Sequence, residues 1–293
     1  MKSSKSALLA LLLLVSSVVF GQDYAFKVMA SKGNNEMKSG GTWQPVKIGA
    51  SLKASDEIKL ADNSYIGLIH KSGKPLEIRE AKPFKVSDLE AQVKGGSSAL
   101  NKYTDFILSN NEKKSSLSAT GAVHRATETN AISVMLPESQ YSGVYNNQVI
   151  IRWDNSDLTG PFVVTMSNLF GDVLDKVETS EKNIWLDLSQ PKFAEWPVIN
   201  VSVNAKADPK KSSKQYTVKR LSTSDSEKIA KQLKEIMGEL SEPTALNHIL
   251  LAGFYESQGL LIDAMASYEQ AVKIEPYYQE DYNGFLLRHG LKR

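Results

Sequence analysis

Histidine offers the widest range of chemistry near neutral pH, and the chain contains four histidines. They fall in four separate segments, at His70, His124, His248 and His289. A metal site or a proton relay needs several polar groups to converge, because a lone imidazole seldom acts as a ligand. The sequence therefore predicts a structural position for each one: a strand end, a linker, an interhelix position and a helix end.

Other patterns that carry catalysis are also missing from the sequence. There is no Gly-x-Ser-x-Gly elbow, phosphate-binding glycine loop, His-Glu-x-x-His pair or dinucleotide fingerprint. The neighbouring carboxylates Asp56-Glu57 and Glu280-Asp281 should point apart, whereas a glycosidase needs two carboxylates that face each other across a cleft. We expect no enzyme activity, cofactor or metal site, with a divergent hydrolase assembled from distant residues as the catalytic alternative.

Tyrosine and asparagine side chains in the C-terminal part are the candidates for contact with a partner. Asn247, Tyr255 and Tyr268 could line a concave helical groove. Tyr277 and Tyr278 follow a proline, and they could either cap a helical stack or contact a partner. The four tryptophans, in contrast, lie in or beside alternating strands, so we expect all four to be buried.

The first 21 residues have the pattern of a secretory signal peptide. Lys2 and Lys5 precede an apolar run over residues 7–20, and Val19 and Gly21 occupy the positions that a signal peptidase inspects. These 14 residues span about 21 Å at about 1.5 Å each, less than the roughly 30 Å of a hydrocarbon core. We therefore expect export to a bacterial periplasm and no membrane span after cleavage.

Composition restricts the class of partner further. The chain has no cysteine, which excludes disulfides, thiolate ligands and the lipid-bearing cysteine of a lipoprotein. Of its 35 Lys and Arg residues, two lie in the predicted signal peptide, so 33 remain against 33 Asp and Glu. This balance argues against nucleic acid or an anionic membrane surface as the partner.

Residues 22–109 are expected to form a small β domain with trailing helices. Short alternating strands are predicted at residues 24–28, 43–48, 57–60 and 65–69, separated by turns rich in glycine and asparagine. A helical stretch begins at Ser87 and should break at Gly95-Gly96.

The first part of this segment, about residues 23–86, resembles the FecR-type periplasmic β domain. The residues that carry the resemblance are Trp43, Val46, Ile48-Gly49 with Leu52, Asp56-Glu57-Ile58, the run 63–69 and Gly73. The resemblance implies extracytoplasmic sensing of a ligand or a protein. Direct anti-sigma activity is not expected, because the chain lacks the cytoplasmic sigma-binding segment of those regulators.

A linker and a second β domain are expected next. Residues 110–140 are rich in Ser, Thr, Asn, Glu and Lys, which is typical of a linker. Residues 141–222 contain candidate strands at 148–153, 161–167, 173–177, 183–188, 198–204 and 215–221. Strands at this spacing, with an early tryptophan, predict an immunoglobulin- or fibronectin-like β-sandwich.

Residues 223–293 have a helical period, and about residues 245–278 resemble a tetratricopeptide repeat. The resemblance lies in Leu251, Tyr255, Gly259, Ala264, Tyr268, Ala271 and Pro276. His248 and Ala252 replace the usual tryptophan and glycine. Because about three repeats are normally needed for stability, other helices and the tail 280–291 should act as neighbours or caps.

Together these features predict a mixed multidomain protein with a small all-β domain, a β-sandwich and a helical hairpin. The favoured function is an exported, non-catalytic scaffold or adaptor that binds envelope proteins. Recognition of a glycan or peptidoglycan by the first β domain is the alternative binding function.

Overall fold

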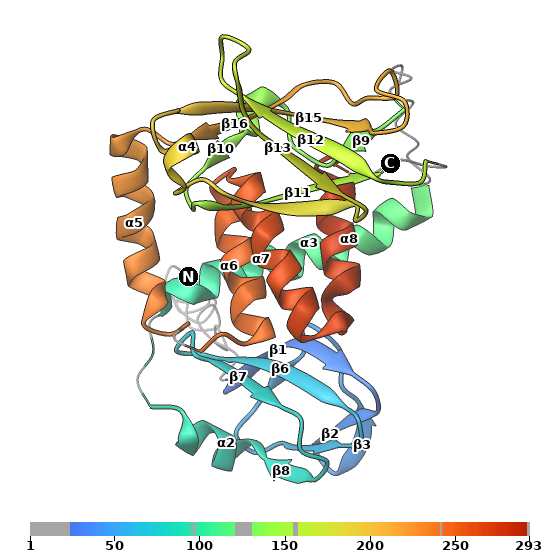
Figure 1. Ribbon diagram of the computed structural model, residues 1–293. Coiled ribbons are helices and arrows are strands. Elements are labelled where there is room, and N and C mark those ends of the chain that lie inside the picture. Colours follow the sequence, from blue (N-terminus) through green and yellow to red (C-terminus); the bar gives the residue numbers. More distant parts are fainter. Residues whose placement is uncertain are drawn as a thin grey trace, which may run out of the picture.

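The computed structural model describes residues 24–94, 96, 98–120, 131–154, 158–240 and 242–291. The predicted signal peptide, His124 and the middle of the predicted linker lie outside the described residues. Two β modules lie at opposite ends of the molecule, and the C-terminal helices lie between them (Figure 1). The expected combination of β-sheets with a C-terminal helical region is confirmed.

The first β module, residues 24–85, consists of two antiparallel sheets with the orders β4-β1-β6-β7 and β3-β2-β5-β8. Its strands are β1 (Phe26–Lys32), β2 (Asn35–Ser39), β3 (Thr42–Pro45), β4 (Ser51–Leu52), β5 (Glu57–Leu60), β6 (Tyr65–His70), β7 (Pro75–Ile78) and β8 (Pro83–Lys85). Alternate residues such as Phe26, Ile58 and Leu68 face a core enclosed by the module itself. Every residue of β6 is buried, so its other face must also be covered.

Two helices follow the first module. They are α2 (Val86–Gln92) and, after the short helix η1 (Ser98–Leu100), α3 (Asn101–Thr120). The predicted break is present, and Gly96 adopts a φ of +133° where a Cβ atom would lie 2.1 Å from Ser72 Oγ. The linker was predicted to begin at residue 110, which is too early, since α3 continues to Thr120. The polar composition of that segment hides the helix, because helices are recognised by an apolar period.

The second β module occupies the described part of residues 131–220. Its strands are β9 (Ser133–Val134), β10 (Gly143–Val144), β11 (Gln148–Asp154), β12 (Phe162–Ser167), β13 (Val173–Thr179), β14 (Asn183–Asp187), β15 (Val198–Ala205) and β16 (Tyr216–Arg220), with the short helices η2 (Ser139–Tyr141) and α4 (Pro191–Ala194). They form sheets of order β10-β16-β15-β12-β13 and β14-β11-β9. Each predicted strand is present, and buried Trp153 of β11 meets Phe162 of β12 edge to face at 5.7 Å.

The C-terminal helices are α5 (Thr223–Met237), α6 (Ala245–Ser257), α7 (Leu261–Ile274), the short η3 (Pro276–Tyr278) and α8 (Gln279–Arg288). We call α6, α7, η3 and α8 the helical unit. Its central helix, α6, begins where the Thr244 side chain accepts a hydrogen bond from the backbone of Asn247. The helix carries apolar residues on all its sides, which is typical of a helix buried within a protein.

Helices α6 and α7 pack against each other, and their neighbours come from distant parts of the sequence. Helix α3 packs on α6, where a Cβ atom on Gly253 would lie 2.6 Å from the Ile107 side chain. Helix α8 covers α7 through Tyr268, whose ring lies 5.9 Å from Tyr282 and 4.9 Å from Phe285. The tail therefore acts as a neighbour, as expected.

One continuous apolar core joins the helical unit to both β modules. It includes Met29 and Ile69 of the first module, Leu250 and Phe254 of α6, and Val149 of the second module. Among the described residues, no helix is both long and apolar enough to cross a membrane.

Two of the four tryptophans contradict the expectation of burial. Trp43 and Trp185 are exposed, Trp153 is buried and Trp196 is half-buried. Trp43 lies on β3 and Trp185 on β14, and both strands are sheet edges whose outer face meets solvent. Alternation of residue types identified the strands correctly but did not show which face is covered.

Candidate functional site at the module junctions

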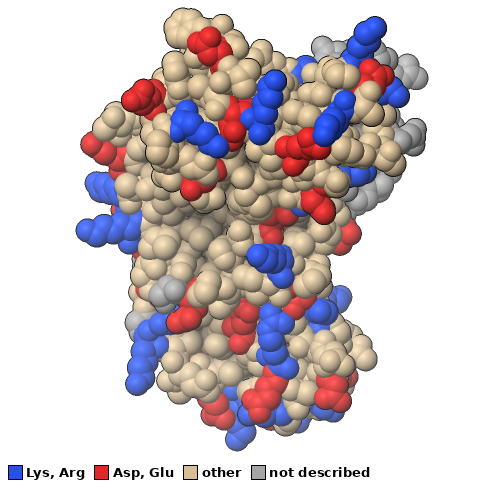
Figure 2. Space-filling model, viewed as in Figure 1, with Lys and Arg blue, Asp and Glu red and all other residues tan. Residues whose placement is uncertain are grey.

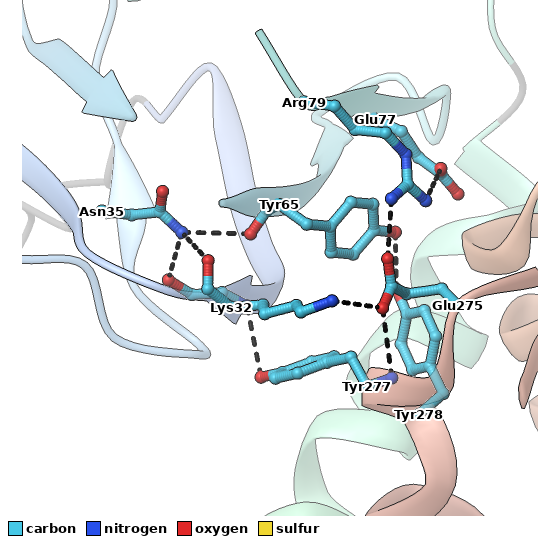
Figure 3. Close-up of polar contacts among 9 residues, drawn as sticks. Lys32, Asn35, Tyr65, Glu77, Arg79, Glu275, Tyr277 and Tyr278 are labelled. Atoms are coloured by element: carbon cyan, nitrogen blue, oxygen red, sulfur yellow. Dashed lines mark hydrogen bonds and ion pairs between the residues drawn. The ribbon is translucent and has the colours of Figure 1, made fainter. Parts of the chain in front are cut away.

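The junction between the first β module and the helical unit is centred on Glu275, whose side chain is 4 % exposed. Its carboxylate pairs with Lys32 Nζ at 2.9 Å and with Arg79 Nη1 at 2.6 Å, as Figure 3 shows. It also accepts a hydrogen bond from the backbone N–H of Tyr277 at 3.2 Å. Glu275 precedes Pro276 and has an extended conformation that ends α7, since a residue before proline disfavours the helix.

Electrostatics at this junction favour an ionised Glu275. Burial acts to raise the pKa of the carboxyl, but hydrogen bonds from Arg79 and Lys32 outweigh it and hold the pKa below its usual value. The two cations belong to the first module and the anion belongs to the helical unit. The pairs therefore stabilise the contact between them.

Tyrosines fill the space beside this ion pair. The hydroxyls of Tyr65 and Tyr278 lie 2.9 Å apart, and Tyr277 Oη accepts a hydrogen bond from the Ser31 backbone at 3.4 Å. The Arg79 guanidinium lies 4.5 Å from the centre of the Tyr65 ring, which is a cation–π contact. Burial raises the pKa of Tyr65 and of Tyr278, so both remain neutral donors or acceptors.

A second contact of the first module is made at the start of α6. Glu77 Oε1 accepts a hydrogen bond from the backbone N–H of Leu246 at 2.6 Å. The first N–H groups of a helix lack partners within the helix, and the positive end of its dipole attracts a carboxylate. Glu77 therefore acts as an N-terminal cap supplied by another module.

The opposite junction, between the helical unit and the second module, is centred on Asp263 of α7. The residue is fully buried, and its two oxygens accept backbone hydrogen bonds from Tyr145 and Asn146, each at 2.8 Å. Asn146 Nδ2 donates to Tyr255 Oη at 2.9 Å. Burial raises the pKa of Asp263 to about 6, although the backbone hydrogen bonds act to lower it.

An ion pair lies beside this contact and also joins the second module to α7. Arg152 of β11 meets Glu269 of α7, with Nε 2.7 Å from Oε1 and Nη2 2.9 Å from Oε2. The Nη2–Oε2 contact is a hydrogen bond, and the Nε–Oε1 contact is an ion pair without hydrogen-bond geometry. The direction of β11 across α7 is therefore determined by charge as well as by apolar packing.

A polar network inside the helical unit ties its helices together. Buried Glu256 of α6 accepts hydrogen bonds from Arg288 Nη2 at 2.9 and 3.0 Å and from Tyr268 Oη at 3.3 Å, and its Oε1 lies 2.9 Å from His289 Nε2. Burial acts to raise the Glu256 pKa, but the contacts with His289 and Arg288 outweigh it and lower the pKa. The carboxylate is thus a paired structural anion.

The structure distributes the five residues predicted to bind a partner over four places. Tyr277 and Tyr278 lie at the first junction, Tyr255 lies at the second, and Tyr268 lies between α7 and α8. Asn247 is buried and donates to the backbone oxygen of Glu242 at 2.7 Å.

The sequence leaves open whether the helical unit forms a groove. The side chains that could line such a groove, Asn247, Tyr255 and Tyr268, are buried in contacts within the chain. Tyr255 is covered by the second module, Tyr268 by α8, and Asn247 bonds to the segment just before α6. Whether any of these residues also contacts a partner stays a prediction.

The described histidines occupy structural positions. His70 ends β6, with Nδ1 2.7 Å from Ser72 Oγ, His248 lies on α6, and His289 ends α8 beside Glu256. No group of three or more His, Asp or Glu arranged to hold a metal ion occurs within the described ranges. Sequence reasoning missed Glu275 and Asp263, whose only signal was a carboxylate within or directly after an apolar helical segment.

The outward surfaces of the modules differ from the junctions in character. On the face shown in Figure 2, charges of both signs are interspersed over both β modules. Large apolar side chains are also exposed on the two modules, including Leu169, Phe170 and Val173 on the second module and Trp43 on the first.

A scan against protein-family models and a search of curated proteins each found no match to this chain.

Proposed function

We propose that this chain is an exported, non-catalytic scaffold or adaptor of the bacterial envelope, which binds envelope proteins through the outward surfaces of its β modules. In this proposal the first module is a FecR-like domain, the second is immunoglobulin-like, and the helical unit is tetratricopeptide-like. The helical unit binds two β modules of the same chain rather than a foreign peptide.

The observation that carries the proposal is the pair of charged, buried junctions on opposite sides of the helical unit. Glu275 meets Lys32 and Arg79 on one side, and Asp263 accepts two backbone hydrogen bonds on the other. Directional contacts of this kind fix the relative orientation of the modules more closely than apolar packing does. Two binding surfaces held at a fixed separation are what an adaptor requires.

The test is co-purification from cells that make the tagged full chain at its native level, after gentle crosslinking of the envelope. We expect specific envelope proteins in amounts well above those recovered with an exported tag alone, and a mature chain that begins at Gln22. Recovery equal to the tag control, or a chain retained in the cytoplasm, would contradict the proposal. Truncation after Leu221 is unsuitable as a control, because it would uncover the apolar faces of both modules.

Binding of a glycan by the first module is a second candidate, favoured by exposed Trp43. All four residues of its edge strand β3 are exposed, and Lys38 Nζ lies 5.8 Å from the centre of the indole. An exposed indole offers a flat apolar face to a sugar ring. Sedimentation with purified cell wall tests this function, and we expect the wild type to sediment and Trp43→Ala to remain in solution. A wild type that stays in solution would exclude glycan binding, and equal sedimentation of both would exclude Trp43 as the contact.

A further inference from the structure

The turn between β12 and β13, residues 168–172, is fixed by its own hydrogen bonds. Asn168 Oδ1 accepts from the backbone N–H groups of Phe170 and Asp172, each at 2.9 Å, and its Nδ2 donates to Asp172 Oδ2 at 2.9 Å. The backbone of Asn168 bonds to Asp172 at 3.0 Å and to Gly171 at 3.2 Å. The Asn168 side chain therefore serves as the internal frame of the turn, and it is almost fully buried.

Hydrogen bonds from the neighbouring strands β15 and β16 also stabilise this turn. Asn200 of β15 donates its Nδ2 to the Asn168 carbonyl at 3.4 Å, and its Oδ1 accepts from Thr217 Oγ1 of β16 at 3.2 Å. The support crosses two adjacent strands of the same sheet. A turn that is ordered before binding loses little conformational entropy when a partner covers it.

The side chains at the tip of the turn, residues 169 and 170, are not needed for its conformation. Asn168 supplies the hydrogen bonds and Gly171 supplies a φ of +91°, whereas the two side chains between them make no hydrogen bond within the turn. Leu169 and Phe170 occupy those positions and are 63 % and 84 % exposed, and neighbouring Val173 is 53 % exposed. Single exposed apolar residues are common, but three within five positions on an ordered tip indicate a contact surface.

We propose that this tip, the Leu169–Phe170 anchor, inserts into an apolar pocket of an envelope protein that carries a cationic side chain at its rim. The exposed carboxylate of Asp172, the only charged group of the turn, supplies the complement to that cation. The same carboxylate would be repelled by anionic lipid, which is why the occupant is a protein. This inference rests on the proposed adaptor function and names the surface that performs it.

The first test places a photo-crosslinking p-benzoylphenylalanine at position 170 of the full chain in cells. The matched control carries it at position 287 on α8, where Leu287 is 61 % exposed, close to the 63 % of Leu169. We expect one envelope protein to crosslink from position 170 and not from position 287, at residues that line an apolar pocket with a Lys or Arg at its edge. Crosslinks to lipid, to a second copy of the chain, to no molecule, or to the same protein from both positions would overturn the inference.

The second test measures the affinity of the purified chain for the crosslinked protein. Phe170→Ser should weaken binding about 10- to 100-fold, because aromatic anchors dominate interface affinity, whereas Leu287→Ser should leave it unchanged. Asp172→Asn should weaken it several-fold at low salt and less at high salt. An unchanged affinity for Phe170→Ser would overturn the inference.

Failure of this inference and failure of the adaptor proposal give different results. If the wild type and the double variant Leu169→Ser/Phe170→Ser recover the same envelope proteins in equal yield, the adaptor proposal stands and the proposed role of the Leu169–Phe170 anchor is wrong. If the wild type recovers no protein above the tag control, both are wrong.

Discussion

Replacement of Glu275 by glutamine tests the junction between the first β module and the helical unit. The change keeps the size of the side chain and an oxygen that can accept from the Tyr277 backbone. It removes the charge that faces Lys32 and Arg79, at 2.9 and 2.6 Å. Glu275→Gln therefore removes both ion pairs and leaves an amide nitrogen facing the Arg79 guanidinium.

The expected loss follows from the exposure of the partners. Charge-assisted hydrogen bonds contribute about 1.5–3 kcal/mol each when both groups are buried. Glu275 is buried, but Lys32 and Arg79 are 43 % and 48 % exposed, so solvent screening reduces each contribution to about 0.5–1.5 kcal/mol. We expect the free energy of unfolding to fall by about 1–3 kcal/mol. The matched control Glu178→Gln removes a pair with both side chains exposed and should cost less than about 1 kcal/mol.

The dependence on pH distinguishes this ion pair from simple packing. The folded pKa of Glu275 lies below its usual value, so its stabilisation is present above the unfolded pKa of about 4.3 and is lost as the pH falls through the folded pKa. The assay is urea unfolding of the wild type and Glu275→Gln at pH 7 and at pH 3. The difference in unfolding free energy should shrink at pH 3. An equal difference at both pH values, or a loss no larger than that of Glu178→Gln, would show that the two ion pairs do not stabilise the junction.

Three further changes probe the rest of the helical unit by urea or thermal unfolding. Asp263→Asn should destabilise the chain by about 1–3 kcal/mol, because one amide nitrogen would face a backbone N–H. Its effect should be larger at pH 5 than at pH 7.5, since a raised pKa of about 6 means that the wild-type residue contributes less as the pH rises through that value. Gly253→Ala should cost about 1–3 kcal/mol, because its Cβ would lie 2.6 Å from an α3 side chain. The control Gly238→Ala, where no atom lies within 4 Å of the added Cβ, should cost nothing. Equal effects of the two changes would contradict the packing of α3 on α6. Arg288→Met should cost about 3–5 kcal/mol by leaving Glu256 buried without its main partner, and a loss below about 1 kcal/mol would show that this network is unimportant.

Local structure could be predicted from the sequence because it depends on local signals. Alternation and turn residues located the strands β11 to β16 of the second module but not the two-residue strands β9, which lies in the predicted linker, and β10. The small residues of α6 and α7 located their pairing. Burial of Trp153 followed from its place in an alternating strand. The exposure of Trp43 and Trp185 could not be predicted in this way, because the alternation of a strand does not show whether the strand lies at a sheet edge.

The arrangement of the modules could not be predicted in the same way, although two signals were present. Strand β6 has apolar or small residues on both faces, and α6 is apolar all round. A strand or helix of this kind must be covered on every side. The sequence does not show which elements cover them. In the structure, the covering elements are α3 and the two β modules, which lie far away along the chain.

The binding candidates illustrate the same limit. Tyr255, Tyr268 and Tyr278 stand out as aromatic residues in a repeat-like segment, yet the structure buries them at contacts within the chain. Glu275 and Asp263 determine the junctions, but a carboxylate in or beside a helix normally faces solvent. Their role depends on partners more than a hundred residues away.

Hydrogen exchange during a urea titration tests most directly the claim that the helical unit joins both β modules into one body. Mass spectrometry of peptides covering β6, α6 and β11 reports on the first module, the helical unit and the second module in one experiment. We predict that all three lose protection at the same urea concentration, because one continuous core and two charged junctions connect them. Protection of β6 or β11 that persists after α6 has exchanged would show that the modules are independent, and would contradict the account.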